Sequence, residues 1–171
     1  MATHPAHVLR VNARELLRQP GARRELVAGL EPADLGLDDD RIVGTIDVGL
    51  EAVSSIDGIV VRGAVTVGWR GVCRRCLAEV DGVAVIPVDE LYQDDLSDDD
   101  AYPIEGDQID MAAPVRDYVV LELPDGPLCR PDCAGICPVC GADRNDAPCT
   151  CDTAVRDERW AALDGFEVDD G

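Results

Sequence analysis

Three stretches of the chain carry the pattern that decides its fold. Residues 41–53 read RIVGTIDVGLEAV, residues 59–72 read IVVRGAVTVGWRGV, and residues 80–92 read VDGVAVIPVDELY. Val and Ile dominate them, and alternate positions from Ile42 to Leu50 are apolar or glycine, which is the two-residue period of a strand with one buried face. A Ser-Ser-Ile-Asp-Gly turn and a cysteine pair separate the three stretches. The sequence therefore predicts an antiparallel meander.

The N-terminal part of the chain holds the densest positive charge. Residues 8–11 predict a short strand, and Asn12 can cap a helix over residues 13–18 that Pro20 and Gly21 end. Four arginines lie close together here: Arg14, Arg18, Arg23 and Arg24. A solvated helix face is the plainer interpretation of this cluster, and a docking patch for an acidic partner is the alternative.

Further elements are expected after the strands. Residues 94–100 include five Asp, which repel one another and predict a loop. Asp110 is a candidate N-cap for a helix over residues 111–123, with Pro114 tolerated in its first turn. Three apolar residues near the C-terminus recur at helical spacing and predict a terminal helix that packs on the body of the protein. They are Trp160, Leu163 and Phe166.

The predicted fold class is α+β, an antiparallel β meander with a few short helices and a C-terminal segment stapled by zinc. Length allows one ordinary core and a small appended module, since the chain has 171 residues. We expect three parts: a β-rich core domain with a CxxC hairpin at 8–127, a cysteine-rich zinc-binding segment at 128–154, and a short helix and tail at 155–171.

Composition narrows the classes of function. The formal net charge is -20, so attraction to a phosphate backbone is disfavoured. Two Trp, three Tyr and one Phe are too few for a base-stacking platform. No signal peptide and no run near the roughly 18 apolar residues of a membrane span is evident, so a cytoplasmic location without a membrane partner is expected. Because the cytoplasm is reducing, closely spaced cysteines are more often metal ligands there than disulfide partners.

Eight cysteines are the candidate metal ligands: Cys73, Cys76, Cys129, Cys133, Cys137, Cys140, Cys149 and Cys151. A CxxC at a chain reversal lets two thiolates converge on one zinc ion, and Gly141 after the second CxxC permits the turn that such a knuckle needs. A thiol oxidoreductase is the alternative, but its CxxC opens a helix, whereas the residues after Cys76 predict a strand. We therefore expect two structural zinc ions.

Two groupings of these ligands are open. In the first, the four cysteines from 137 to 151 form one site, while Cys129 and Cys133 join the Cys73–Cys76 pair. In the second, the four cysteines from 129 to 140 share one ion, and Cys149 and Cys151 join that pair. Both histidines, His4 and His7, lie near the N-terminus, so a catalytic zinc with histidine ligands is poorly supported. No phosphate-loop, dinucleotide or serine-elbow motif is present, and no enzymatic activity or small-molecule substrate is expected.

The order of the motifs resembles the YceD family of large ribosomal RNA subunit accumulation proteins. The resemblance runs from residue 8 to residue 166, and its parts are Asn12-Ala-Arg-Glu-Leu-Leu-Arg-Gln-Pro-Gly21, Cys73-x2-Cys76, the Asp110-led helix ending in Leu121-Glu-Leu-Pro124, Pro127-Leu-Cys129 and Gly135-Ile-Cys-Pro-Val-Cys-Gly141. It implies a role in 23S ribosomal RNA accumulation and large-subunit assembly, with no enzymatic activity established. Family members are often encoded beside a large-subunit ribosomal protein that can itself carry a zinc ribbon.

Two functions compete at this point. The first is a ribosome assembly factor that binds a basic ribosomal protein or a precursor of the large subunit, with Arg70, Arg74 and Arg75 as a local contact to 23S RNA or merely as surface charge around the ligands. The second is a thiol redox or zinc-handling protein whose cysteines cycle.

Overall fold

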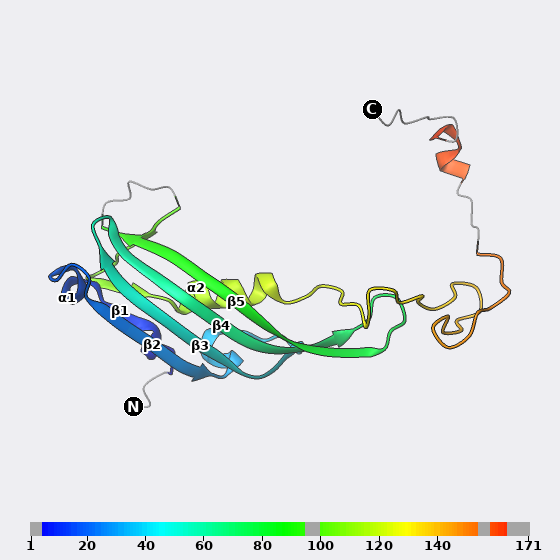
Figure 1. The fold of residues 1–171 in the computed structure, drawn as a ribbon, viewed down its shortest axis with the longest axis horizontal. Coiled ribbons are helices and arrows are strands. Elements are labelled where there is room, and N and C mark those ends of the chain that lie inside the picture. The colour runs from blue at the N-terminus through cyan, green and yellow to red at the C-terminus, as the bar shows by residue number, and fades with distance from the viewer. Residues whose placement is uncertain (1–4, 95–99, 154–157, 164–171) are drawn as a thin grey trace.

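A five-stranded sheet dominates the computed structural model, which describes residues 5–94, 100–153 and 158–163 (Figure 1). Its strands are, in spatial order, β2 (Arg23–Leu30), β3 (Ile42–Ser55), β4 (Gly58–Val72), β5 (Glu79–Gln93) and β6 (Tyr102–Pro103). All neighbours are antiparallel except β5 and β6. The strands β1 (Arg10–Asn12) and β7 (Gln108–Asp110) form a separate antiparallel pair. The predicted α+β class and antiparallel meander are confirmed.

The helices are short. They are the 3-10 turns η1 (Pro5–Leu9), η2 (Pro32–Leu35) and η3 (Glu158–Leu163) and the α-helices α1 (Ala13–Leu17) and α2 (Ala112–Glu122). Asn12 caps α1 as predicted, since its Oδ1 accepts the Glu15 N–H at 2.9 Å. Within the described ranges, no helix is long and apolar enough to cross a membrane.

The core lies on one face of the sheet. Side chains alternate along each long strand, and one set is buried: Ile46, Val48, Leu50 and Ala52 on β3, Ile59, Val61, Val65 and Val67 on β4, and Ile86 and Val88 on β5. Val115 and Val119, four residues apart on α2, close over this face together with Leu9, Leu16 and Leu35. Figure 1 shows α2 behind the sheet. None of the described helices covers the opposite face.

The β4–β5 hairpin extends beyond this core. Its ladder continues from Trp69 paired with Gly82 to Val72 paired with Glu79, and it ends in the loop that holds Cys73 and Cys76. In Figure 1 this tip meets the yellow segment that follows α2. The β4–β5 hairpin therefore places Cys73 and Cys76 beside the start of the cysteine-rich segment.

The sequence did not predict β2, and the arginine cluster is arranged differently from the expectation. Arg23 and Arg24 lie on β2 and not on a helix, because residues 23–30 pair with residues 46–53 of β3. Arg23 forms an ion pair with Glu51 at 3.2 Å, and Arg14 forms one with Asp107 at 2.7 Å. This local neutralisation weakens the alternative of a docking patch for an acidic partner.

The C-terminal expectations are met only in part. Asp110 accepts the Ala112 N–H at 2.9 Å, although Met111 occupies the N-cap position of α2. Trp160 lies in the 3-10 turn η3 and is 64% exposed, so its predicted packing on the body is wrong. Phe166, and residues 95–99 of the acidic loop, lie outside the described residues. The division into parts at 8–127, 128–154 and 155–171 stays a prediction.

Two neighbours on β5 test the one-sided core. Ile86 is 2% exposed and Val85 is 66% exposed. Ile86→Ala should lower the free energy of unfolding by about 2–5 kcal/mol, because it leaves a cavity among packed side chains. Val85→Ala should change it by under about 0.5 kcal/mol. Urea denaturation followed by circular dichroism measures both, and equal losses would contradict the assignment of the buried face.

Candidate metal centres

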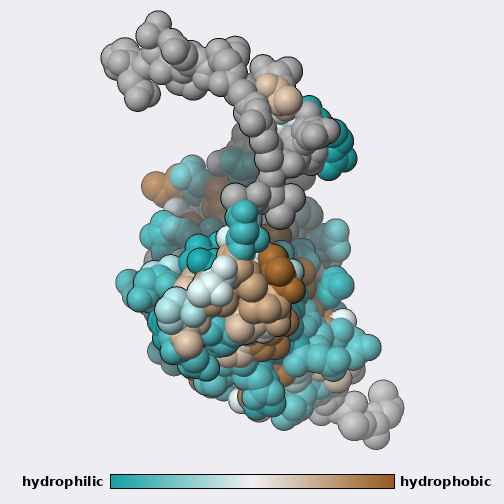
Figure 2. Space-filling model, turned by 90° about the vertical axis from the view of Figure 1, so that its right-hand side faces the viewer, coloured by the Kyte–Doolittle hydropathy of each residue, from teal (hydrophilic) through white to brown (hydrophobic). Residues whose placement is uncertain are grey.

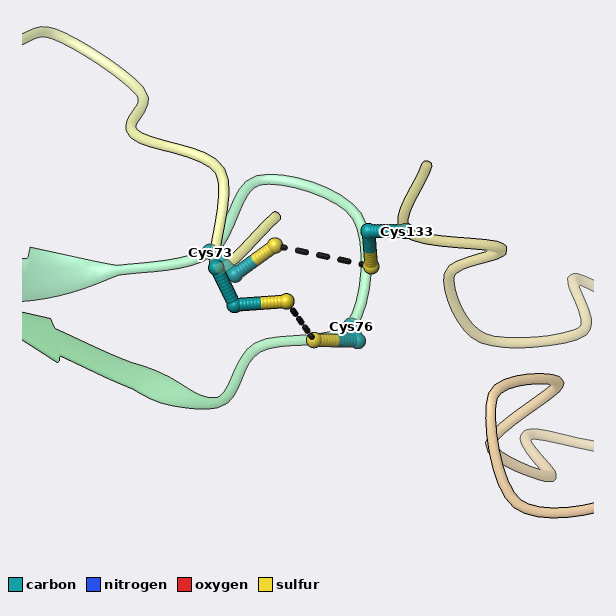
Figure 3. A group of neighbouring side chains, drawn as sticks. Cys73, Cys76 and Cys133 are labelled. Carbon is teal, nitrogen blue, oxygen red and sulfur yellow. Dashed lines mark hydrogen bonds between the residues drawn. The ribbon is translucent and has the colours of Figure 1, made fainter. Parts of the chain in front are cut away.

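The eight cysteines gather in two groups of four, and in each group all four Sγ atoms lie within 4.8 Å of one another. The first cluster is Cys73, Cys76, Cys129 and Cys133, and the second cluster is Cys137, Cys140, Cys149 and Cys151. This is the first of the two groupings that the sequence left open. Figure 3 shows Cys73 and Cys76 at the hairpin tip with Cys133 facing them from the segment after α2. Each cluster could hold a metal ion.

The two CxxC motifs adopt the same backbone turn. In the first, the Cys73 N–H donates to the Ala78 carbonyl at 2.7 Å, and the Leu77 N–H donates to the Cys73 carbonyl at 2.9 Å. In the second, the Cys137 N–H donates to the Ala142 carbonyl at 2.8 Å, and the Gly141 N–H donates to the Cys137 carbonyl at 2.8 Å. The same turn therefore forms once between two strands and once in an irregular segment.

The fourth position after the first cysteine is left-handed in both turns. Gly141 has a φ of 74° and Leu77 a φ of 62°. Glycine takes this conformation at little steric cost, which is why Gly141 was a useful signal in the sequence, whereas a residue with a Cβ pays about 1–2 kcal/mol. The first turn therefore has Leu77 in a left-handed conformation, at the position where the second turn has Gly141.

The sulfur separations in the first cluster fit a tetrahedral thiolate site. The Sγ atoms of Cys73 and Cys133 are 3.8 Å apart, and those of Cys76 and Cys129 are 3.6 Å apart. Zn–S bonds of about 2.3 Å place the sulfurs of a tetrahedron about 3.8 Å apart. A disulfide requires about 2.05 Å, so these sulfurs are not bonded to one another. The set of donors is entirely sulfur, which suits zinc among the common divalent ions.

Backbone amides favour the thiolate at the first cysteine of each motif. The N–H groups of Cys129 and Cys76 lower the pKa of the Cys73 thiol to about 6. Those of Cys140 and Val139 lower the pKa of Cys137 to about 6. Hydrogen bonds from amides stabilise the charged form of an acceptor sulfur.

Crowding of the sulfurs has the opposite effect on Cys129 in the first cluster and on Cys151 in the second. A hydrogen bond to the Cys133 sulfur, burial and repulsion raise the pKa of the Cys129 thiol to about 12, and a hydrogen bond to the Cys140 sulfur with the same two effects raises the pKa of Cys151 to about 12. A second negative charge at this distance is disfavoured unless a cation offsets it. The clusters therefore combine stabilised thiolates with a repulsion that a bound cation would relieve.

The hairpin tip and the cysteine-rich segment are joined by hydrogen bonds as well as by the first cluster. The Arg74 N–H donates to the Pro127 carbonyl at 3.0 Å, and the Ile136 N–H donates to the Arg75 carbonyl at 2.9 Å. The Arg75 guanidinium reaches over the segment to the carbonyls of Pro131 at 3.2 Å and Cys133 at 3.0 Å. Arg75 therefore supports the backbone around Cys133, and all three arginines, Arg70, Arg74 and Arg75, are exposed.

Asn145 is a site residue that the sequence reasoning missed. It lies between Cys140 and Cys149, in the second cluster's loop, yet its Nδ2 donates to the Cys133 sulfur of the first cluster at 3.4 Å. Its Oδ1 accepts the Ala134 N–H at 2.8 Å. An asparagine in a turn is too common for the sequence to have revealed this role. The loop of one cluster therefore contributes a hydrogen bond to the other.

The surface at this end is partly apolar. Figure 2 looks onto the end of the molecule that carries the cysteine-rich segment and shows a group of apolar residues surrounded by hydrophilic ones. Val139, between the two cysteines of the second CxxC, is 60% exposed, and Ile136 is 37% exposed.

Comparison with known proteins gives a consistent result. The profile of the family described as large ribosomal RNA subunit accumulation protein YceD matches residues 61–167. An uncharacterised protein of Mycobacterium tuberculosis is 36% identical over 172 aligned positions, which cover 94% of this chain and 82% of that protein. A chloroplastic protein of Zea mays, named large ribosomal RNA subunit accumulation protein YCED homolog 1, is 37% identical over 51 positions, 29% of this chain and 17% of the other. No solved structure matches.

Asn145→Ala tests the link between the two clusters. Loss of the amide removes hydrogen bonds to the Cys133 sulfur and to the Ala134 N–H, so we expect a loss of about 1 kcal/mol in stability and faster alkylation of Cys133. Alkylation followed by mass spectrometry measures the rate at each cysteine. Asp146→Ala, an exposed change one residue away, is the matched control, and equal rates for Cys133 in the two variants would contradict the role of Asn145.

Proposed function

Because the chain belongs to the YceD family of large ribosomal RNA subunit accumulation proteins, we propose that it supports 23S ribosomal RNA accumulation and assembly of the large ribosomal subunit. The observation that carries this proposal is the family match over residues 61–167, which contains most of β4, all of β5 and both cysteine clusters. The name of the family implies a role in large-subunit ribosomal RNA accumulation. The finer assignment, a non-enzymatic assembly factor, is our proposal.

The proposed cofactor is zinc, two ions with a structural role. The eight cysteines would hold them, four in each cluster, and the fit rests on the sulfur separations of 3.6 and 3.8 Å and on the all-sulfur donor set. Four thiolates close a tetrahedral site and leave no position for a substrate or a water nucleophile. When bound, zinc would supply cross-links; the chain itself supplies the amides and the Arg75 guanidinium that fix the ligands.

The geometry of the CxxC turns argues against the alternative of thiol redox catalysis. Redox pairs of this spacing depend on a helix N-terminus that lowers the pKa of the first thiol. Cys73 instead follows directly after β4, and Cys137 lies in a segment without regular helix. No observation favours zinc handling over a structural site.

The proposed partner is a large-subunit precursor or a basic ribosomal protein, in the cytoplasm. The net charge of -20 favours a positively charged polypeptide over RNA. Arg75 is engaged with the carbonyls of Pro131 and Cys133, so a local contact to 23S RNA at the hairpin tip would fall to Arg70 and Arg74. We propose no membrane and no small-molecule partner.

Metal content tests the structural part of the proposal. Purified full-length protein should contain close to two zinc ions, and all eight thiols should resist alkylation until a strong chelator is added. Chelation should loosen the segment after α2 while the β3–β4–β5 core, which contains no ligand, keeps its far-ultraviolet circular dichroism. Rapid alkylation of Cys73 or Cys76 in metal-loaded protein would favour the redox alternative.

Depletion of the protein tests the functional part. Sucrose gradients of depleted cells should show fewer large subunits and less 23S RNA, with 16S RNA as the internal reference. Complementation should be achieved by the wild-type chain and not by Cys133→Ala, which removes one ligand of the first cluster. Unchanged 23S RNA after depletion would refute the assignment.

A further inference from the structure

The uncovered face of the sheet carries an apolar strip where a solvated face is usually polar. Three adjacent cross-strand rows make up this open strip: Val27–Gly49–Ala64–Pro87, Gly29–Asp47–Thr66–Val85 and Val43–Gly68–Val83. Asp47 is the only charged residue in these rows. Val27 is 70% exposed, and Val83 and Val85 are each 66% exposed.

Two glycines in the open strip have no explanation within the fold. A Cβ at Gly49 would meet only the Ala64 carbonyl oxygen at 4.0 Å, and one at Gly29 would meet the flexible Asp47 side chain at 3.4 Å. Neither residue has a positive φ. By contrast, a Cβ at Gly63, which pairs with Leu50 and Val88, would lie 2.1 Å from the Gly49 carbonyl oxygen.

A glycine inside a strand costs stability and often marks a place where another backbone approaches closely. Gly29 and Gly49 lie on neighbouring strands and open the surface beside Val27. The smooth, shallow shape that results fits an extended polypeptide lying against the sheet, with its backbone close to the glycines and its side chains between the valines.

The charges around the open strip are mainly negative. The flanking rows are Glu25–Glu51–Arg62–Asp89 on one side and Arg70–Asp81 followed by Val72–Glu79 on the other. Arg62 is paired with Asp89 at 2.9 Å and Glu51 with Arg23 at 3.2 Å. Among the described residues, Glu25, Asp81 and Glu79 form no ion pair, so carboxylates remain available at both ends of the strip.

We propose that the open strip binds an extended, positively charged segment of another protein. Small apolar side chains of that segment pack on Val27, Val83 and Val85, and its Lys or Arg side chains reach the flanking carboxylates. A second copy of this chain would bring another net charge of -20 to an acidic face, and a phosphate backbone would be repelled in the same way. The inference rests on the proposed function and deepens it by naming the surface that a basic partner would use.

Site-directed photo-cross-linking in living cells tests the inference with the full-length protein. A photoreactive phenylalanine analogue replaces Val85 in the open strip or, as the control, Ile56, which is 100% exposed in the β3–β4 turn. Each is introduced into the wild-type background and into Gly49→Thr. Thr is a good strand former, and at this exposed position it should leave the unfolding midpoint unchanged or raise it.

The expected result is an adduct from position 85 to a basic polypeptide, identified by mass spectrometry, that is absent at position 56 and falls about tenfold in Gly49→Thr. An adduct to a second copy, an adduct to RNA, an adduct unchanged by Gly49→Thr, or no adduct from position 85 would each overturn the inference. The 23S RNA measurement is independent of these outcomes. If depletion lowers 23S RNA but position 85 gives no adduct to a basic polypeptide, the proposed function stands and the inference fails. If position 85 gives that adduct but depletion leaves 23S RNA unchanged, the strip binds a basic partner outside ribosome assembly.

Discussion

The contact between the β4–β5 hairpin tip and the segment after α2 is the interaction on which the C-terminal part of the structure depends. Beyond Trp69 and Gly82 the two strands leave the apolar core, and Val72 at the end of β4 is 53% exposed. Cys73 is nonetheless completely buried and Cys133 is 3% exposed, and their Sγ atoms lie 3.8 Å apart. Without that contact neither the hairpin tip nor the cysteine-rich segment has a core of its own.

The sequence predicted the central elements well because their physical signals are local. The alternation in β3, the turn at Ile56 and the cap at Asn12 each depend on residues within a few positions. β2 was missed because RRELVAGL begins with three charged residues and owes its strand conformation to pairing with the edge of β3.

The candidate centres show the same division between local and distant information. Both CxxC turns could be predicted from spacing and from Gly141. The grouping could not, since spacing alone allows Cys129 and Cys133 to join either pair. The grouping is visible only in three dimensions, and so is the hydrogen bond from Asn145, in the loop of the second cluster, to the Cys133 sulfur of the first. Such contacts join residues that nothing in the linear pattern relates.

The different spans of the two clusters have a consequence for how each cluster assembles. The second cluster draws its ligands from residues 137–151, a loop short enough to close in the unfolded chain at a small entropic cost. The first joins Cys73 to Cys133, 60 residues apart, and therefore closes a much longer loop. Assembly of the second cluster is therefore local to the C-terminal segment, whereas closure of the first cluster requires that segment to meet the tip of the β4–β5 hairpin.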